Sequence, residues 1–336
     1  MTHEFKKIVA AYQTARDQGV KTVLATVVAL EGSSYRKPGV RMLLLEGGSM
    51  IGAVSGGCVE KEILVQSQSV FKTEIPKVMT YDGRYRLGCE GVLYILLEPF
   101  SLSDLFVDTF NEALKGRITF KITSFYKKEA IEEIGLGTKV QFQNSSYPVS
   151  LRHPLNTALR ILEERMMPCF KLLVIGAEHD AVVLSAMAGL MGWEVIVVAH
   201  PSEGKSISDF PGITEFIRSA PESFQPIGVD QQTALVLMNH SYAKDLLFLQ
   251  ALQDSSPIYI GILGPMHRRE KLLNELIEKN PEVSEEFINA IHGPSGLNIG
   301  SITPQEIALS ILAEIMAVIR NENPMFLRDK VNQYSN

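Results

Sequence analysis

One strand-turn-helix-strand pattern near the middle of the chain constrains the fold more than any other feature. It begins with a short apolar run over residues 172–175 and continues through a glycine-containing turn over 176–181. A helical pattern over 182–191 and a second β-branched run over 194–198 follow directly. These elements form a βαβ unit, whose two strands are parallel neighbours. The sequence therefore predicts a parallel sheet.

The rest of the C-terminal half repeats this alternation. Further strands are predicted at residues 233–238 and 258–263, each followed by a helical segment. We therefore predict that residues 166–336 form a Rossmann-like domain, a doubly wound parallel sheet with helices on both faces. Its last helix starts after Thr303 and carries the capping-box residue Glu306. Since the body of that helix is apolar almost all round, we expect it to be buried, either within the domain or in a homodimer interface.

Residues 1–165 show a different pattern, which predicts a separate N-terminal domain. This range includes the connector to the second domain. Apolar residues recur at helical spacing over residues 5–18. Short β-branched runs separated by polar or glycine-rich turns follow. Strands are predicted over residues 22–30, 40–45, 50–54, 78–82, 91–98, 117–126 and 139–142, and helices over residues 58–71 and 104–114. The predicted fold class is α/β, with an N-terminal α+β domain of short strands before the Rossmann-like domain.

Composition limits the functions open to this chain. The formal net charge is -6 over 336 residues, with no long basic run, so no nucleic-acid partner is expected. No apolar run approaches the length of about 20 residues that spans a bilayer, and the first residues lack the apolar core of a signal peptide. We therefore expect a cytoplasmic protein with no membrane partner. Its three cysteines, Cys58, Cys89 and Cys169, are too few and too scattered for a disulfide framework or a paired zinc motif.

Cys58 lies between a predicted strand and a predicted helix, in the run Ser55-Gly56-Gly57-Cys58-Val59-Glu60. The first turn of a helix presents backbone N–H groups and the positive end of the helix dipole, which stabilise an anion and lower the pKa of a nearby thiol. Gly56 and Gly57 let a ligand approach the backbone closely. We predict a ligand-binding site with a reactive thiol. The alternative is a glycine turn around a buried, inert cysteine.

The turn after the first strand of the C-terminal domain departs from the dinucleotide fingerprint Gly-x-Gly-x-x-Gly. Gly176 holds the first position, but Glu178 and Ala181 occupy the second and third. A carboxylate at the second position crowds and repels a diphosphate. The acid that usually holds the ribose hydroxyls is also missing, because residues 199–201 read Ala-His-Pro. We therefore expect no bound NAD(P), and keep an NAD(P)-linked oxidoreductase as the alternative function.

Polar residues gather where the carboxyl ends of the parallel strands should lie, which is where open α/β sheets bind ligands. His240 follows one strand, residues 264–269 follow the next, and residues 292–297 precede the last helix. Asp245 either orients the imidazole of His240 or only begins a helix. His240 is therefore a candidate binding residue.

Several separated motifs resemble those of the XdhC/CoxI family, the maturation factors of xanthine dehydrogenase and related molybdenum hydroxylases. In the first domain the resemblance rests on residues 25–28, 32–42, 55–60 and 87–91, which read ATVV, GSSYRKPGVRM, SGGCVE and LGCEG. In the second it rests on residues 174–177, 238–240, 259–264, 293–300 and 303–308, which read VIGA, MNH, YIGILG, GPSGLNIG and TPQEIA. The resemblance covers most of the chain. The chain departs from the family pattern at Glu90, at Glu178 and at residues 199–201.

The resemblance implies a protein that binds the molybdenum cofactor (molybdopterin) transiently, protects it while a cysteine desulfurase supplies its sulfido ligand, and passes it to the apo-hydroxylase. Such a protein is a chaperone rather than a catalyst. Within the matching motifs, the thiolate of Cys58 would be a soft ligand that approaches molybdenum or relays sulfur, and Cys89 would be a second thiol or a buried turn residue. The backbone donors of Gly56 and Gly57, with Arg36 or Arg41 as a charge partner, would meet the cofactor phosphate. The remaining candidate cofactor-binding residues are Ser33, Ser34, Ser55, Glu60, Gly176 and His240. A scaffold that joins desulfurase and hydroxylase by protein contacts alone is the third possibility.

Overall fold

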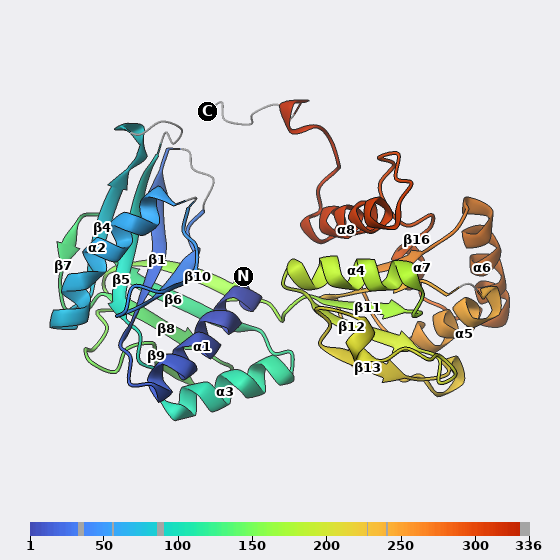
Figure 1. The fold of residues 1–336 in the computed structure, drawn as a ribbon, viewed down its shortest axis with the longest axis horizontal. Helices are drawn as coiled ribbons and strands as arrows, with labels where there is room; N and C mark the ends of the chain where they lie inside the picture. The colour runs from blue at the N-terminus through green and yellow to red at the C-terminus, as the bar shows by residue number, and fades with distance from the viewer. Residues whose placement is uncertain (33–36, 56, 86–90, 227, 240, 330–336) are drawn as a thin grey trace. The chain divides into compact units, whose positions relative to one another are not determined.

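The computed structural model describes residues 1–32, 37–55, 57–85, 91–226, 228–239 and 241–329, apart from the side chains of Cys58 and Tyr85. The chain divides into two compact units, Met1–Pro168 (unit 1) and Cys169–Asn336 (unit 2), which Figure 1 colours from blue to green and from green to red. Each unit has its own sheets and hydrophobic cores. Within the described residues, no helix combines the length and the apolar character that crossing a membrane requires.

Unit 1 contains a six-stranded antiparallel sheet in the order β3-β2-β1-β5-β4-β7. Its strands are β1 (Thr22–Glu31), β2 (Arg41–Leu45), β3 (Met50–Gly52), β4 (Lys77–Asp82), β5 (Val92–Pro99) and β7 (Ile131–Glu132). The central strand β1 is buried along nearly its whole length, as its continuous apolar run predicts. On one face of the sheet, α2 (Cys58–Thr73) contributes Val59, Ile63 and Val70 to the core.

The opposite face of that sheet packs against two helices and a second sheet. The helices are α1 (Thr2–Asp17) and α3 (Asp104–Lys115). The second sheet is antiparallel, in the order β10-β6-β8-β9. Its strands are β6 (Phe120–Tyr126), β8 (Gly137–Gln141), β9 (Ser146–Pro148) and β10 (Arg160–Met166). Since successive strand residues point to opposite faces, Leu43 faces this side while Met42 and Leu44 face α2.

Unit 2 contains a six-stranded sheet in the order β13-β12-β11-β14-β15-β16, in which every pair is parallel. Its strands are β11 (Lys171–Ile175), β12 (Glu194–Ala199), β13 (Glu215–Arg218), β14 (Thr233–Leu237), β15 (Tyr259–Ile262) and β16 (Ile291–His292). Numbered within the unit, this order is 3-2-1-4-5-6, the arrangement of Rossmann dinucleotide-binding domains. The order reverses between β11 and β14, which is the topological switch point of the sheet.

Helices cover both faces of the parallel sheet. α4 (His179–Leu190) and α8 (Pro304–Arg320) pack against each other on one face, and α5 (Tyr242–Leu252), α6 (Met266–Lys279) and α7 (Glu285–Asn289) cover the other (Figure 1). The predicted fold class is therefore confirmed. α8 starts as its capping box predicts, since the Glu306 carboxylate accepts from the Thr303 N–H at 2.8 Å. Leu309 is 52% exposed, so within unit 2 the helix is buried along one side only.

The strands β7, β9, β10 and β13 have no counterpart among the predicted elements. β10 reads RILEERM, and its charged side chains hide the alternation by which strands are recognised. The other three are only two to four residues long. All of them lie at an edge of their sheets, where short or charged strands are common because they discourage pairing with other chains.

Candidate functional site

The loop between β3 and α2 is held by the carboxylate of Glu60. Glu60 Oε1 accepts from the backbone N–H groups of Val54 at 3.0 Å and Ser55 at 2.5 Å. Glu60 Oε2 accepts from the N–H of Gly57 at 2.8 Å and from Ser55 Oγ at 2.7 Å. Gly57 is the N-cap of α2 and Glu60 is its third helical residue, which is the spacing of a capping box. The carboxylate therefore closes the loop onto the first turn of the helix.

The surroundings of Glu60 keep this carboxylate ionised. Burial by itself would raise the pKa of Glu60, but hydrogen bonds from Ser55, from its own backbone and from Gly57 outweigh burial and hold the pKa below its ordinary value. Gly57 adopts φ 127° and ψ -31°, a conformation that L side chains rarely take up. A Cβ at Gly57 would meet no atom within 4 Å, so the backbone conformation and not crowding favours glycine there.

In this geometry the N–H of Gly57 is already hydrogen-bonded to a carboxylate of the protein. α2 begins at Cys58, where the positive end of the helix dipole lies, directly after Gly57. The Gly57 N–H, predicted to meet a cofactor phosphate, donates to Glu60 instead. Ser55 and Glu60 shape the loop through their contacts with each other. The Gly57–Glu60 capping-box spacing is the sequence signal that could have revealed this role.

Arg41 lies on the opposite side of the sheet from α2. On β2 it shares a face with Leu43, whereas Met42 packs in the core next to α2. The Arg41 side chain is 4% exposed and forms an ion pair with Glu164 of β10, and its Nη1 donates to the carbonyl of Gly39 at 3.0 Å. This placement gives Arg41 a role in joining the two sheets of unit 1. Its pairing with a cofactor phosphate stays a prediction.

Glu98 of β5 is a second buried carboxylate that sequence reasoning missed. Its Oε2 accepts from the Thr138 N–H at 2.8 Å and its Oε1 from Thr138 Oγ1 at 2.6 Å, and Thr138 Oγ1 lies 2.8 Å from Ser124 Oγ. Burial raises the pKa of Glu98 to about 7, although the Thr138 hydrogen bonds and the charge of Arg41 lower it. A lone acid inside the otherwise apolar strand β5 was the available signal.

In unit 2, a hollow of about 230 Å³ lies at the carboxyl ends of β11, β12 and β14, at the topological switch point. Its lining residues are Gly176, Ala177, Glu178, His200, Glu203, Asn239, Ser241 and Lys244. Gly176 has φ 125°, and a Cβ there would lie 2.7 Å from the carbonyl carbon and oxygen of Met238, so the close approach of two strand ends requires glycine. Glu178 is the exposed N-cap of α4, and its side chain forms no capping hydrogen bond.

Comparison with known proteins agrees with these two units. The family model described as "XdhC and CoxI family" matches residues 15–82, and the model described as "XdhC Rossmann domain" matches residues 172–315. The chain belongs to the XdhC/CoxI family. The family is thus the one that the sequence resemblance implied.

Relatives and a solved structure align over nearly the whole of this XdhC/CoxI chain. A protein of Bacillus subtilis, named as a probable subunit of xanthine dehydrogenase, is 29% identical over 317 residues, which cover 88% of this chain and 92% of the relative. The molybdenum cofactor insertion chaperone PaoD of Escherichia coli is 26% identical over 325 residues, 95% of this chain and 90% of the relative. The crystal structure of a xanthine dehydrogenase from Bacillus halodurans is 25% identical, with a TM-score of 0.77, and the match covers 94% of this chain and 96% of that one.

Several predicted site residues of this family member lie outside the described residues. They are Ser33, Ser34, Arg36, Gly56, Cys89 and His240, together with the side chain of Cys58. Among the side chains that the structure does describe, no three of His, Cys, Asp or Glu come together in a way that would hold a metal ion. The assignment of Cys58 as a metal ligand stays a prediction.

Asp245, predicted to orient His240 or to begin a helix, lies in the first turn of α5 and is 1% exposed. Its Oδ1 accepts from Asn239 Nδ2 at 3.1 Å, and its Oδ2 forms an ion pair with Arg268 Nη2 at 2.6 Å. These contacts tie the loop after β14 to the first turn of α6. The pairing with His240 stays a prediction, because His240 is outside the described residues.

Proposed function

We propose that this protein is a maturation factor for molybdenum hydroxylases. It binds the molybdenum cofactor in unit 1, holds it while a cysteine desulfurase installs the sulfido ligand, and delivers it to a xanthine dehydrogenase-type enzyme. The relatives whose names refer to xanthine dehydrogenase and to molybdenum cofactor insertion support this role. The observation that carries it is the start of α2 at Cys58, directly after a loop that Glu60 holds in place.

In this proposal, the thiolate of Cys58 is the protein's ligand for the molybdenum of its cargo. A thiolate is a soft ligand, and the positive end of the α2 dipole stabilises its negative charge. The cofactor phosphate takes its partners from elsewhere, since the Gly57 N–H already donates to Glu60. We assign the phosphate to Ser33, Ser34 and Arg36, with Arg36 as its charge partner.

A retention assay tests the binding step. The protein is incubated anaerobically with free molybdenum cofactor and desalted, and the retained pterin is quantified by fluorescence after oxidation. Wild type should retain the pterin, and Cys58→Ala should retain several-fold less. Cys169→Ala is the matched control, because Cys169 is buried in unit 2 and should not affect retention.

The same assay distinguishes the alternatives. Equal retention by wild type and Cys58→Ala would rule out the thiol as the ligand. Co-purification of desulfurase and hydroxylase with a protein that retains no pterin would favour a scaffold. Adding apo-xanthine dehydrogenase to the loaded protein tests delivery, since the pterin should then elute with the enzyme.

An NAD(P)-linked oxidoreductase remains the competing function, and the strand order and switch-point hollow of unit 2 are the observations that favour it. We expect no saturable binding of NADPH, because Glu178 places a carboxylate at the second glycine position of the fingerprint. Titration with NADPH, followed by the fluorescence of Trp193, measures this. Saturable binding would contradict the expectation and would assign a nucleotide to unit 2.

We also propose that the protein is a homodimer that buries the exposed side of α8. Ile302, two residues before α8, and Leu309, on α8, are 85% and 52% exposed, and exposed apolar side chains gathered at one helix mark a candidate protein contact. Light scattering after size exclusion should give twice the mass of one chain, and Leu309→Glu should give the mass of one. A monomeric wild type would contradict this proposal and leave the proposed cofactor role intact.

A further inference from the structure

A second hollow lies in unit 1, at the opposite end of α2 from Cys58. It has a volume of about 230 Å³. Its lining includes the buried apolar side chains of Val70, Phe71 and Phe100 and the charged side chains of Lys21, Glu74 and Arg152. α2 has 16 residues and so measures about 24 Å at a rise of about 1.5 Å per residue. The hollow is therefore separate from the proposed cofactor site.

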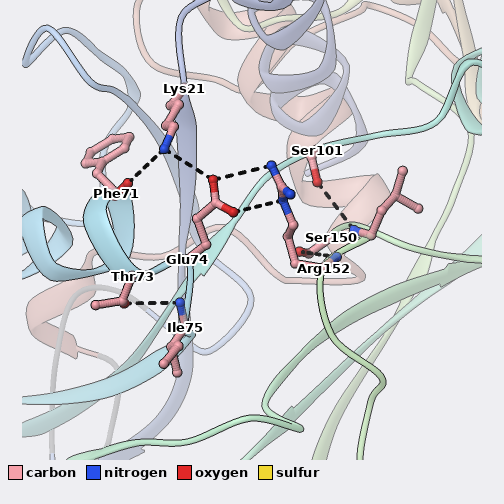
Figure 2. Close-up of polar contacts among 9 residues, drawn as sticks. Lys21, Phe71, Thr73, Glu74, Ile75, Ser101, Ser150 and Arg152 are labelled. Carbon is pink, nitrogen blue, oxygen red and sulfur yellow. Dashed lines mark hydrogen bonds and ion pairs between the residues drawn. The ribbon is translucent and has the colours of Figure 1, made fainter.

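Figure 2 shows Lys21 and Arg152 on either side of the Glu74 carboxylate. Lys21 Nζ lies 3.2 Å from Glu74 Oε1, and Arg152 Nε lies 2.9 Å from Glu74 Oε2. Lys21 Nζ also donates to the carbonyl of Phe71, in the last turn of α2, at 3.3 Å. Two cations thus share one carboxylate at the hollow, which leaves one positive charge in excess.

Glu74 holds these cations from an unfavourable position. It is the C-cap of α2, with φ 58° and ψ 13°, in the left-handed region that favours glycine or asparagine. Its carboxylate lies beside the negative end of the helix dipole, where a cation would be favoured. Both features cost stability, and strain of this kind is often retained where a site needs it. Glu74 therefore holds Lys21 and Arg152 together at the hollow and competes with an incoming anion for their charges.

The geometry points to a binding site for a small organic anion with an apolar body, such as an aromatic carboxylate. The anionic group would meet Lys21 and Arg152, and the body would lie on the apolar floor. Arg16 also lines the hollow, but it pairs with Asp104 at 2.6 Å and adds no free charge. Because the hollow is smaller than the pockets of drug-sized ligands, which begin at about 300 Å³, the ligand has about ten non-hydrogen atoms.

Calorimetric titration of the full chain with benzoate at low ionic strength tests this site. Wild type should bind benzoate saturably, and Lys21→Met and Arg152→Gln should each weaken binding by about tenfold, since each removes a charge that meets the anion. Lys72→Met is the matched control, because Lys72 is an exposed lysine in the last turn of α2 that does not line the hollow. Glu74→Asn should bind benzoate several-fold more tightly, because it frees both cations and suits the left-handed backbone.

Inorganic phosphate serves as the probe for the charged group alone. It should bind more weakly than benzoate, because it cannot use the apolar floor. Absence of saturable benzoate binding to wild type would overturn the proposal, and so would an equal loss of binding in Lys72→Met. Phosphate binding as tight as that of benzoate would overturn the assignment of an apolar body. The molybdenum cofactor takes no part in these titrations, so their outcome is independent of the proposed function.

Discussion

The two units each place a glycine turn between a strand and the start of a helix. They differ in whether a nearby glutamate side chain accepts hydrogen bonds from the backbone of the turn. In unit 1, Glu60 folds back from the third position of α2 and accepts from the N–H groups of Val54, Ser55 and Gly57. In unit 2, Glu178 is itself the N-cap of α4, and its side chain forms no capping hydrogen bond. Side chains on a helix lean toward its N-terminus, so a glutamate at the third position can reach the turn.

This difference teaches that a glycine turn before a helix is not by itself an anion site. In unit 1 the protein's own carboxylate takes the Gly57 amide, which leaves the thiol of Cys58 as the feature with which we expect a ligand to interact. In unit 2, Glu178 lines the switch-point hollow, where we expect its carboxylate to oppose the binding of a diphosphate. The same local pattern therefore predicts different chemistry in the two units.

The largest expected effect on the free energy of unfolding comes from replacing one glycine of each turn by alanine. Gly176→Ala should lower the free energy of unfolding of unit 2 by about 4 kcal/mol, because the backbone is strained for alanine and the Cβ collides with Met238. Gly57→Ala should cost unit 1 only about 2 kcal/mol, since it carries the strain without the collision.

Urea denaturation can follow each unit separately. Trp193 is the one tryptophan of the chain and lies in unit 2, so its fluorescence reports that unit alone. Hydrogen exchange of the amides of β1 reports unit 1. Equal destabilisation by the two substitutions would show that the Met238 contact does not distinguish the two turns.

A pH series extends the comparison to Glu98, which differs from Glu60 in that its pKa is raised and not lowered. The folded state binds the Glu98 proton more tightly than the unfolded chain does, so its contribution to stability is complete below pH 4.5 and is lost as the pH rises through about 7. The loss amounts to about 3 kcal/mol in unit 1. Glu98→Gln should remove this pH dependence of stability, because the neutral amide does not titrate.

Urea denaturation at pH 5 and pH 8 measures this effect, with hydrogen exchange of the β1 amides reporting unit 1. The control is Glu163→Gln on β10, where the glutamate side chain is 48% exposed and the pH dependence should persist. A wild type whose unit 1 is equally stable at both pH values would contradict the raised pKa of Glu98.

The smallest expected effect tests the two carboxylates directly. Glu60→Ala should lower the free energy of unfolding by about 2 kcal/mol, because the loop donors lose an ionised acceptor. Glu178→Ala should change it by less than about 0.5 kcal/mol, since its exposed side chain caps nothing. Glu62→Ala, on the same helix as Glu60, is the control in unit 1. Similar losses for Glu60→Ala and Glu178→Ala would remove the distinction between the two turns.

Much of the fold could be predicted because its signals are local. The residues that make up each apolar run, in β11, β12, β14 and β15, are neighbours in the chain. The same holds for the capping-box residues of α8. The charged edge strand β10 could not be predicted, because its strand conformation depends on pairing with β6. The position of Cys58 at the start of α2 was predictable for the same local reason. The contacts of Arg41 were not, because they depend on which face of β2 meets the second sheet.

The sequence by itself determined most of the strand, turn and helix pattern, the position of each glycine turn and the motifs of the XdhC/CoxI family, because periodicity and capping act over neighbouring residues. Only the tertiary structure decided that Arg41 pairs with Glu164, and that Lys21, Glu74 and Arg152 meet at one hollow. These partners lie far apart in the chain. Packing of whole elements brings them together, and no local pattern contains that information.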